Sequence, residues 1–333
     1  MPTNRKSLAV LSLASCLLAL AACGDPGSGG GVADPTTQTS ATGASCEPVA
    51  GEKLVVLEDD KTLQNADNVI PAVSASVAEA NPTVVPLLDA VSDALDTDKL
   101  IALNKAVDID RQTSSEVAHG FVKDEGLAAQ EKSGEGVSVV IGAANFSESS
   151  TLANIYAEVL RTAGFDAQVR EIGARETYLP ALESGELAAV PEYAATLAEF
   201  LNASVNGADA EPVASGDVDA TVAALEPLAA ERGLVVGAAS AAQDQNAFAV
   251  TQGFADEHGV STLSELAEAC GGGLTLAGPA ECPERPFCQP GLEETYGLVF
   301  TDFTAYDFAL IGEAVRKGEA AIGLVLSSDG SLG

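Results

Sequence analysis

The sequence predicts an α/β protein with two lobes and a ligand cleft. Residues 137–196 alternate apolar runs with helical patterns in the order strand, helix, strand, helix, strand. About 280 residues follow residue 50, which is large for one hydrophobic core and natural for two lobes. Polar stretches follow the first and third of these strands, and open α/β sheets bind ligands at such strand ends.

The strand and helix boundaries in this unit follow from apolar spacing. Residues 137–142 form an apolar run, and Leu152, Ile155, Tyr156, Val159 and Leu160 then recur at helical spacing until Gly164. A second strand over residues 165–172, a second helix ending near Gly185 and a third strand over residues 187–190 complete the unit. The loops ANFSES and PEYAAT follow the first and third strands, so they are expected to line the cleft.

The first residues have the pattern of an export signal. Arg5 and Lys6 precede an apolar stretch over residues 8–20, and LAAC ends at Cys23. We expect a signal peptide at residues 1–22, lipidation of Cys23 and a flexible tether at residues 23–50. Cys16 fits the same pattern with a shorter apolar core. A transmembrane anchor is the alternative, but the run falls short of the roughly 20 residues that a span needs.

The chain is strongly acidic, with 49 Asp and Glu against 16 Lys and Arg. Its formal charge is −33, and loss of residues 1–22 would make it two units more negative. This charge excludes nucleic acid as a partner. It favours solubility and attracts cations.

Four cysteines remain once Cys23 is set aside, and an even number in an exported protein favours disulfides. Three pairings are possible. Cys282 and Cys288 bracket a short loop, so we expect them to pair and to leave Cys46 with Cys270. A zinc site is the competing interpretation, but the cysteine spacing does not fit one, and no metal is expected.

The motifs IGAANFSES, LANIYAEVLRTAG and PEYAAT resemble those of the osmoprotectant-binding proteins of ABC importers, which capture glycine betaine, choline and related compounds. The resemblance continues through AAQDQNAFAVT (241–251), ERPFCQPGLEETYG (284–297) and SSDG (327–330). It implies a two-lobed, type II-like periplasmic-binding fold with the ligand cleft between the lobes.

The order of the segments differs from that of the family. Residues 54–61, 68–82, 88–108 and 116–127 resemble the segment that normally closes the family's chain. The resemblance therefore implies a circular permutation, with Gly333 near residues 52–54 and the old ends joined through residues 128–136. An assembly of unrelated domains is the alternative.

This permuted order implies a division into lobes. The larger lobe is expected at residues 51–240, formed by the permuted segment 51–130 together with 137–240. The smaller lobe is expected at residues 241–326. Residues 327–333 would return to the larger lobe. Because of the permutation, the chain would end there instead of continuing through this crossing.

The family holds a quaternary ammonium among aromatic faces, which attract cations. The resemblance implies that Tyr193 and Phe248 belong to this cage, that Thr196 binds the polar end of the ligand and that Arg285 pairs with a ligand carboxylate. The remaining expected contacts are Asn145, Phe146, Ser147, Ser149, Gln245 and Asn246. The sequence departs from the family pattern at Ala144, Gly312 and Leu326. Fewer aromatic side chains are therefore expected around the ligand. Tyr306 and Asp307 could fill the vacancy.

The expected function is that of a monomeric, lipid-anchored, extracytoplasmic protein that delivers an osmoprotectant to an ABC permease subunit. Its only membrane contact would be the lipid, and no cofactor is expected. Ser147 beside Glu148 superficially suggests a nucleophile, but neither histidine lies in a matched loop, so an enzyme is not expected. The alternatives are a sensory or structural lipoprotein with the same fold, and a receptor for a different small zwitterion or amino-acid-like solute.

Overall fold

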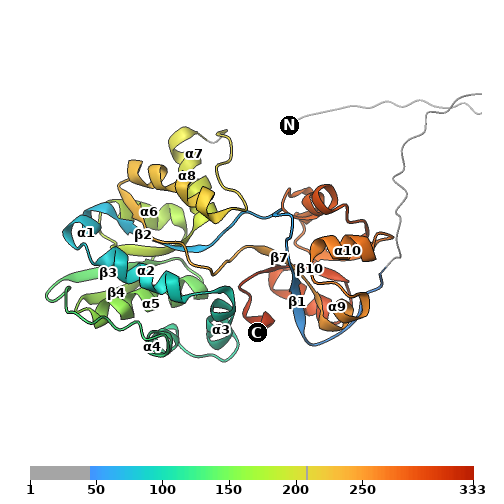
Figure 1. Ribbon diagram of the computed structural model, residues 1–333, viewed down its shortest axis with the longest axis horizontal. Coiled ribbons are helices and arrows are strands. Elements are labelled where there is room, and N and C mark those ends of the chain that lie inside the picture. Colours follow the sequence, from blue (N-terminus) through green and yellow to red (C-terminus); the bar gives the residue numbers. More distant parts are fainter. Residues whose placement is uncertain (1–45, 208) are drawn as a thin grey trace, which may run out of the picture. The chain divides into compact units, whose positions relative to one another are not determined.

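A computed structural model describes residues 46–207 and 209–333 and shows two five-stranded sheets with helices on their faces (Figure 1). The predicted α/β class is therefore confirmed. Residues 1–45 lie outside the described part of the chain, and with them the expected signal peptide, Cys23 and most of the tether. Within the described residues, no helix is both long enough and apolar enough to span a membrane.

The first sheet has the strand order β4-β3-β5-β2-β6. Its strands are β4 (Asp166–Glu171), β3 (Ser138–Ala143), β5 (Ala189–Tyr193), β2 (Val69–Ser74) and β6 (Leu234–Val236). β3 pairs in parallel with β4 and β5, whereas β2 is antiparallel to β5 and β6. The predicted unit of three strands and two helices thus supplies three of the five strands, from the edge strand β4 to the central strand β5.

Helices cover both faces of the first sheet (Figure 1). One face carries α2 (Val84–Ala94), α3 (Thr97–Asp108), α4 (Ser114–Asp124) and α5 (Ser147–Thr162). The other carries α6 (Arg175–Glu183), α7 (Ala194–Asn206) and α8 (Val218–Glu231), and the short α1 (Ala75–Ala80) follows β2. The helix α5 is buried along most of its length because it lies between the sheet and the helices α2, α3 and α4.

One boundary differs from the sequence prediction in a way that matters for the site. β5 continues to Tyr193, so PEY belongs to the strand and only AAT begins α7. The prediction ended this strand at Val190 and placed PEYAAT in the loop that follows. Pro191 lies opposite Pro71 of β2, so the two residues without an N–H share one position in the ladder.

The second sheet has the strand order β1-β7-β10-β8-β9. Its strands are β1 (Leu54–Leu57), β7 (Asn246–Thr251), β10 (Ile322–Leu326), β8 (Leu274–Gly278) and β9 (Phe300–Ala305). The helices of this part are α9 (Gln252–His258), α10 (Leu263–Ala269), α11 (Gln289–Gly291) and α12 (Ile311–Arg316). Short helical turns lie at Cys282–Glu284, Leu292–Tyr296, Phe308–Leu310 and Gly330–Leu332.

The expected lobe boundary at residue 51 does not agree with this sheet. β1 pairs with β7 along its whole length, so it belongs to the second sheet rather than to the larger lobe. Leu54 and Leu57 are both buried there, which explains why this short apolar strand lies on β7.

The chain passes between the two sheets at residues 58–68 and again at residues 237–245. Only the second of these crossings was expected. Residues 327–333 do contact the larger lobe: the Lys105 Nζ donates to the Gly333 carbonyl oxygen over 2.9 Å. However, the return crossing is the continuous segment 58–68, so the expectation of an opened crossing is wrong.

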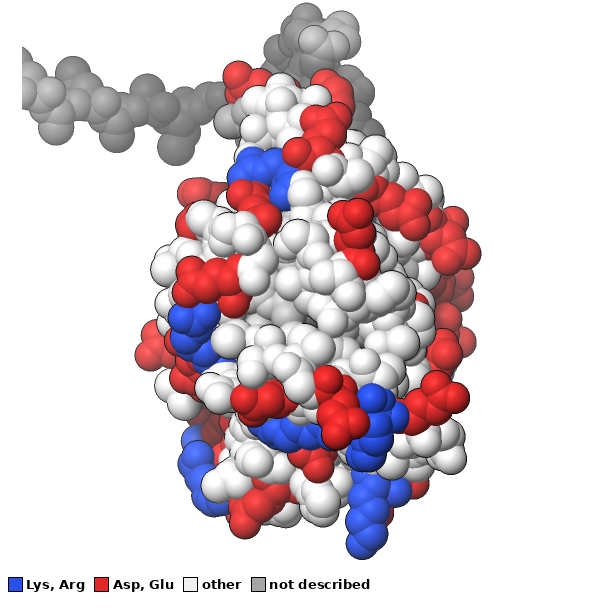
Figure 2. Space-filling view, turned by 90° about the vertical axis from the view of Figure 1, so that its left-hand side faces the viewer, with Lys and Arg blue, Asp and Glu red and all other residues white. Residues whose placement is uncertain are grey.

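Both expected disulfides are present, Cys46 with Cys270 and Cys282 with Cys288. The acidic composition is visible on one face of the molecule, where acidic side chains surround an uncharged centre and outnumber the basic ones (Figure 2).

Candidate functional site

A cavity of about 820 Å³ lies where the ends of β3 and β5 meet residues from both crossings. The larger lobe contributes the residues after these strands, and the second sheet contributes the start of β7 and the end of β10. Its lining consists of Gln64, Asn65, Asp67, Phe146, Arg175, Tyr193, Ala195, Thr196, Glu199, Phe200, Asp244, Gln245, Asn246, Phe287 and Leu326. The predicted position of the cleft, at the carboxyl ends of these strands, agrees with this cavity.

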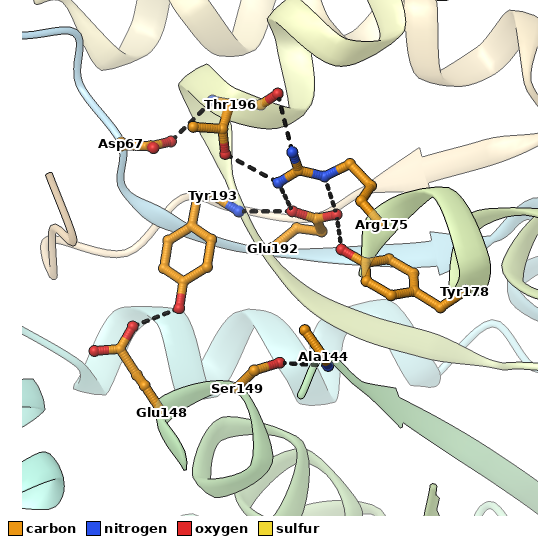
Figure 3. A network of polar contacts seen from close by, with 9 residues as sticks. All are labelled: Asp67, Ala144, Glu148, Ser149, Arg175, Tyr178, Glu192, Tyr193 and Thr196. Carbon is orange, nitrogen blue, oxygen red and sulfur yellow. Dashed lines mark hydrogen bonds and ion pairs between the residues drawn. The ribbon is translucent and has the colours of Figure 1, made fainter. Parts of the chain in front are cut away.

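Tyr193 stands at the centre of the site, as the last residue of β5 (Figure 3). Its hydroxyl donates a hydrogen bond to the Glu148 Oε1, at the beginning of α5. The ring of Phe146 stacks near it, with 6.3 Å between the ring centroids and 27° between the planes. Phe146 is 45% exposed, so it offers an apolar face to the cavity.

Four aromatic side chains line the cavity: Phe146, Tyr193, Phe200 and Phe287. Phe200 and Phe287 were not predicted. Phe200 lies four residues after Thr196 and therefore on the same face of α7, a spacing that could have indicated it. Phe287 adjoins Cys288, and its carbonyl oxygen accepts a hydrogen bond of 3.0 Å from the Gln64 Nε2. These two rings add to the aromatic lining that the sequence predicted, Phe200 from outside the matched motifs and Phe287 from within the matched segment 284–297.

The single cationic side chain in the cavity lining, Arg175, is bound to a buried carboxylate (Figure 3). Its Nε and Nη2 donate to the two oxygens of Glu192 over 2.8 and 2.6 Å. The Tyr178 hydroxyl donates to the same carboxylate, and the Arg175 Nη2 also donates to the Thr196 Oγ1 over 3.0 Å. The charge of Arg175 is therefore already balanced.

Asp67 faces the same cavity and is 8% exposed. Its Oδ1 accepts a hydrogen bond from the Thr196 backbone N–H over 3.0 Å (Figure 3). Burial raises the pKa of Asp67 to about 7, against the lowering effects of this hydrogen bond and of Arg175. Asp67 has no basic partner of its own, because Arg175 is committed to Glu192.

Two further acids lie together beneath Tyr193. The Asn104 Nδ2 donates to the Glu148 Oε2 over 2.5 Å, and the Ser328 Oγ donates to the Asp244 Oδ1 over 2.8 Å. Burial, followed by the charge of Asp244, raises the pKa of Glu148. Burial also raises the pKa of Asp244, which is hydrogen-bonded to Glu148. The site therefore combines aromatic faces with buried acids that form no ion pair with a basic side chain of the described residues, an arrangement suited to a cation.

The structure places several other predicted residues near this cavity. Gln245 and Asn246 line it, and the Gln245 Oε1 accepts from the Asp67 N–H over 3.3 Å. Asn145 and Ser149 line a smaller cavity of about 300 Å³ on the other side of Phe146 and Tyr193. The Ser149 Oγ accepts from the Ala144 N–H, so it caps the loop (Figure 3). Ser147 begins α5 and lines neither cavity.

Two predicted contacts are not brought into this cavity. Phe248 is 1% exposed and lies in the core of the second sheet, because β7 is covered on both faces. Arg285 is exposed and lines a separate cavity of about 850 Å³ on the second sheet, together with Tyr306 and Asp307. That cavity shares only Asn246 and Phe287 with the first.

The positions that depart from the family pattern differ in their surroundings. Leu326 lines the cavity, and Ala144 is buried at the end of β3. Gly312 lies on α12, where an added Cβ would stand 3.3 Å from the Leu54 Cδ1. A tyrosine there would meet the packed strand β1, so its absence does not weaken the cavity.

Donor atoms that could hold a metal come together at Cys46, His258 and Cys270. The two sulfurs are bonded to each other in the disulfide, which leaves only the histidine as a free donor. The His258 Nδ1 lies 3.6 Å from the Cys46 Sγ. This arrangement does not support the zinc interpretation.

Comparisons with known proteins give an extensive match to a family and partial similarity to individual proteins. The model of a family described as the substrate binding domain of an ABC-type glycine betaine transport system matches residues 42–124 and 137–333. A glycine-betaine-binding protein of Pseudomonas aeruginosa is 36% identical over 84 residues, which are 25% of this chain and 27% of that protein. The match therefore spans little more than a quarter of that relative's length.

A solved structure, described as a glycine betaine/carnitine/choline ABC transporter, is also similar. It is 16% identical, with a TM-score of 0.41 over 59% of this chain and 70% of that chain.

Proposed function

The chain belongs to the family of substrate-binding domains of ABC-type glycine betaine transport systems, and on this premise we propose that it captures a small quaternary ammonium or related solute for an ABC importer. The observation that carries the proposal is the cavity of about 820 Å³, lined by four aromatic side chains and by buried acids. Such a lining attracts an ammonium group through the ring faces and through charge.

We assign the ligand contacts to residues that line this cavity. Phe146, Tyr193, Phe200 and Phe287 would surround the ammonium group. The other contacts are Asp67, Thr196, Asp244, Gln245 and Asn246. Phe248 and Arg285, which the sequence suggested, are left out of the proposed site because they line other parts of the molecule.

The proposed setting is extracytoplasmic. Two disulfides suit an oxidising compartment, and the pattern before Cys23 suits lipidation. The protein would act as a monomer held at the membrane by this lipid. Its two lobes would close on the ligand, and the permease subunit would bind this closed, ligand-bound form.

Ligand binding by the purified protein tests this function. A ligand that binds only the folded state raises the melting temperature by mass action. We expect at least one of choline, glycine betaine, carnitine, ectoine, proline and putrescine to raise it and to give saturable heat in calorimetry. A folded protein that responds to none of them would contradict the proposed function.

A further inference from the structure

We propose that the cleft takes its ligand as a net cation and releases a proton in exchange, with Asp67 and Asp244 as the charge partners of the ligand. This inference rests on the proposed function and specifies the ligand charge. It follows from the charges around the cavity, from the pairing of its arginine and from the contacts of its buried acids.

The cavity has a surplus of negative charge. Its lining includes Asp67, Glu199 and Asp244, and the buried Glu148 and Glu192 lie directly behind it. Within this lining, only Arg175 is positively charged. Glu199 accepts from the backbone N–H groups of residues 213 and 214, and Glu192 is paired with Arg175. Among the described residues, no basic side chain forms an ion pair with Asp67, Glu148 or Asp244.

This surplus discriminates against a ligand carboxylate. A carboxylate is best held by a free guanidinium fork, but the Nε and Nη2 of Arg175 already bind Glu192 over 2.8 and 2.6 Å, and its Nη1 donates to the Thr196 carbonyl oxygen over 3.4 Å. A carboxylate placed in the cavity would also lie near Asp67 and Asp244, whose negative charges repel it. A ligand such as choline carries the same ammonium group without that carboxylate, and its hydroxyl can donate to an acid.

Burial raises the pKa of each of the three acids that have no basic partner among the described residues. Asp67 is faced by Arg175, Asp244 and the N–H groups of residues 195 and 196, and its pKa is about 7. Glu148 is faced by Asn104, Tyr193, Ser328 and Asp244. Asp244 is faced by Glu148, Ser328 and Asp329, and its pKa is also raised. The free protein therefore holds protons that a bound cation would displace, because the cation favours the ionised acids.

Calorimetry with choline and glycine betaine tests the exchange. We expect choline affinity to rise about tenfold from pH 6 to pH 8, the change for one displaced proton with a pKa near 7. The binding heat at pH 7 should differ between buffers of different ionisation enthalpy, because the buffer takes up the fraction of a proton that is released on binding. Glycine betaine should bind at least about tenfold more weakly than choline at pH 8.

Two variants test whether Asp67 and Asp244 cause the dependence of choline affinity on pH. Asp67→Asn and Asp244→Asn should each lower choline affinity at pH 8 and reduce its dependence on pH. Asp93→Asn, an exposed acid on α2, is the matched control and should leave both unchanged. Melting temperatures establish that each variant is folded. If a variant does not fold, the pH series and the proton release of the unmodified protein still decide the outcome.

The inference is overturned if glycine betaine binds more tightly than choline, or if choline binds equally at pH 6 and pH 8 without proton release. Unchanged choline binding in both folded variants would also overturn it. These results would leave the proposed function intact, because a solute still binds. Binding of none of the tested solutes would instead overturn the proposed function itself.

Discussion

Tyr193 joins the aromatic lining of the cleft to the acids beneath it. Its ring lines the cavity beside Phe146, and its hydroxyl donates to Glu148. The side chain is 9% exposed, so its position is fixed by packing before any ligand arrives. A ring held in this way requires little ordering when a cation binds, which favours affinity.

Removal of this ring should weaken ligand binding. We expect Tyr193→Ala to reduce the binding free energy of choline by about 1 to 2 kcal/mol, the scale of a desolvated contact between a cation and an aromatic ring. Calorimetry on the folded variant measures the change. Tyr306→Ala, in the separate cavity on the second sheet, is the control and should bind choline normally. Equal affinity in the two variants would remove Tyr193 from the site.

At this scale, the sequence predicted residues that belong to short matched motifs. Phe146, Tyr193 and Thr196 lie in the cavity because strand ends fix them locally. Asp67 and Phe287 were missed because they come from a crossing and from a disulfide loop, whose approach to β5 depends on the packing of the whole chain. Phe248 was assigned to the cage by resemblance to a motif, which does not show how neighbouring strands pack, whereas the structure buries it in β7 between β1 and β10.

The loop between Cys282 and Cys288 is the element that brings Phe287 into the cavity. The disulfide closes a separation of six residues, and Gln64 of the crossing 58–68 holds the Phe287 carbonyl oxygen. Phe287 is 44% exposed, so few packing contacts hold its ring. The covalent closure, this hydrogen bond and two backbone hydrogen bonds within the loop, from the Arg285 N–H to the Cys282 carbonyl oxygen and from the Cys288 N–H to the Arg285 carbonyl oxygen, fix the loop.

Loss of the two disulfides should have different effects. The double variant Cys282→Ala with Cys288→Ala should weaken choline binding several-fold, because the loop that presents Phe287 gains freedom. Its stability should fall by about 2 kcal/mol in the chain-entropy model. The double variant Cys46→Ala with Cys270→Ala should lose more stability, up to about 5 kcal/mol, with unchanged affinity. Equal affinities in the two double variants would contradict a role for the loop.

Among the elements, the sequence predicted the order of strands and helices in residues 137–196 but not where β1 pairs. Periodicity identifies a strand from its own residues, whereas the partner of a four-residue apolar strand depends on distant chain segments. β1 lies on β7, some 190 residues further along the chain, and that pairing moved the lobe boundary from residue 51 to the crossing 58–68.

The stability of the whole molecule should depend on the buried acids of the cleft. Burial raises the pKa of Asp67 to about 7 and also raises that of Glu148, so the folded protein binds protons that the unfolded chain releases near pH 4. Their contribution to the free energy of unfolding is fully present at pH values below the pKa values of the unfolded chain. It is lost as the pH rises through about 7. The acids with lowered pKa values act with the opposite sign, but at pH values below this window.

We therefore expect the ligand-free protein to be more stable at pH 5 than at pH 8, by an amount on the order of a few kcal/mol. Urea unfolding at both pH values measures the difference. Asp67→Asn should reduce it, and Asp93→Asn should not. Stability that is constant or rises between pH 5 and pH 8 would show that these acids do not hold their protons in the folded protein.

The order of the chain is the last feature of the whole molecule to explain, and we propose that it is a circular permutation of the family's order. Two observations support this. The family match omits residues 125–136, where the old ends would be joined. The Arg316 Nε donates to the Glu52 carbonyl oxygen and its Nη2 to that of Ser331, so the two segments that the permutation would separate lie side by side. In Figure 1 the carboxyl end lies next to β1 and α3.

A chain whose two segments are exchanged, so that they follow the family's order, tests the proposal. It begins at residue 137, runs to Gly333, continues through a flexible linker of about ten residues to Cys46 and ends at residue 127. A linker of this length spans up to about 33 Å when extended, enough to leave both disulfides in place. Because every strand pairing and both crossings are kept, we expect this chain to fold cooperatively and to bind choline with the affinity of the original. As a control, a chain opened instead between β7 and α9 separates β7 from the helix that covers it and should be markedly less stable. Failure of the first chain to fold, with the second equally unstable, would mean that the present order is required and is not a rearrangement of the family's.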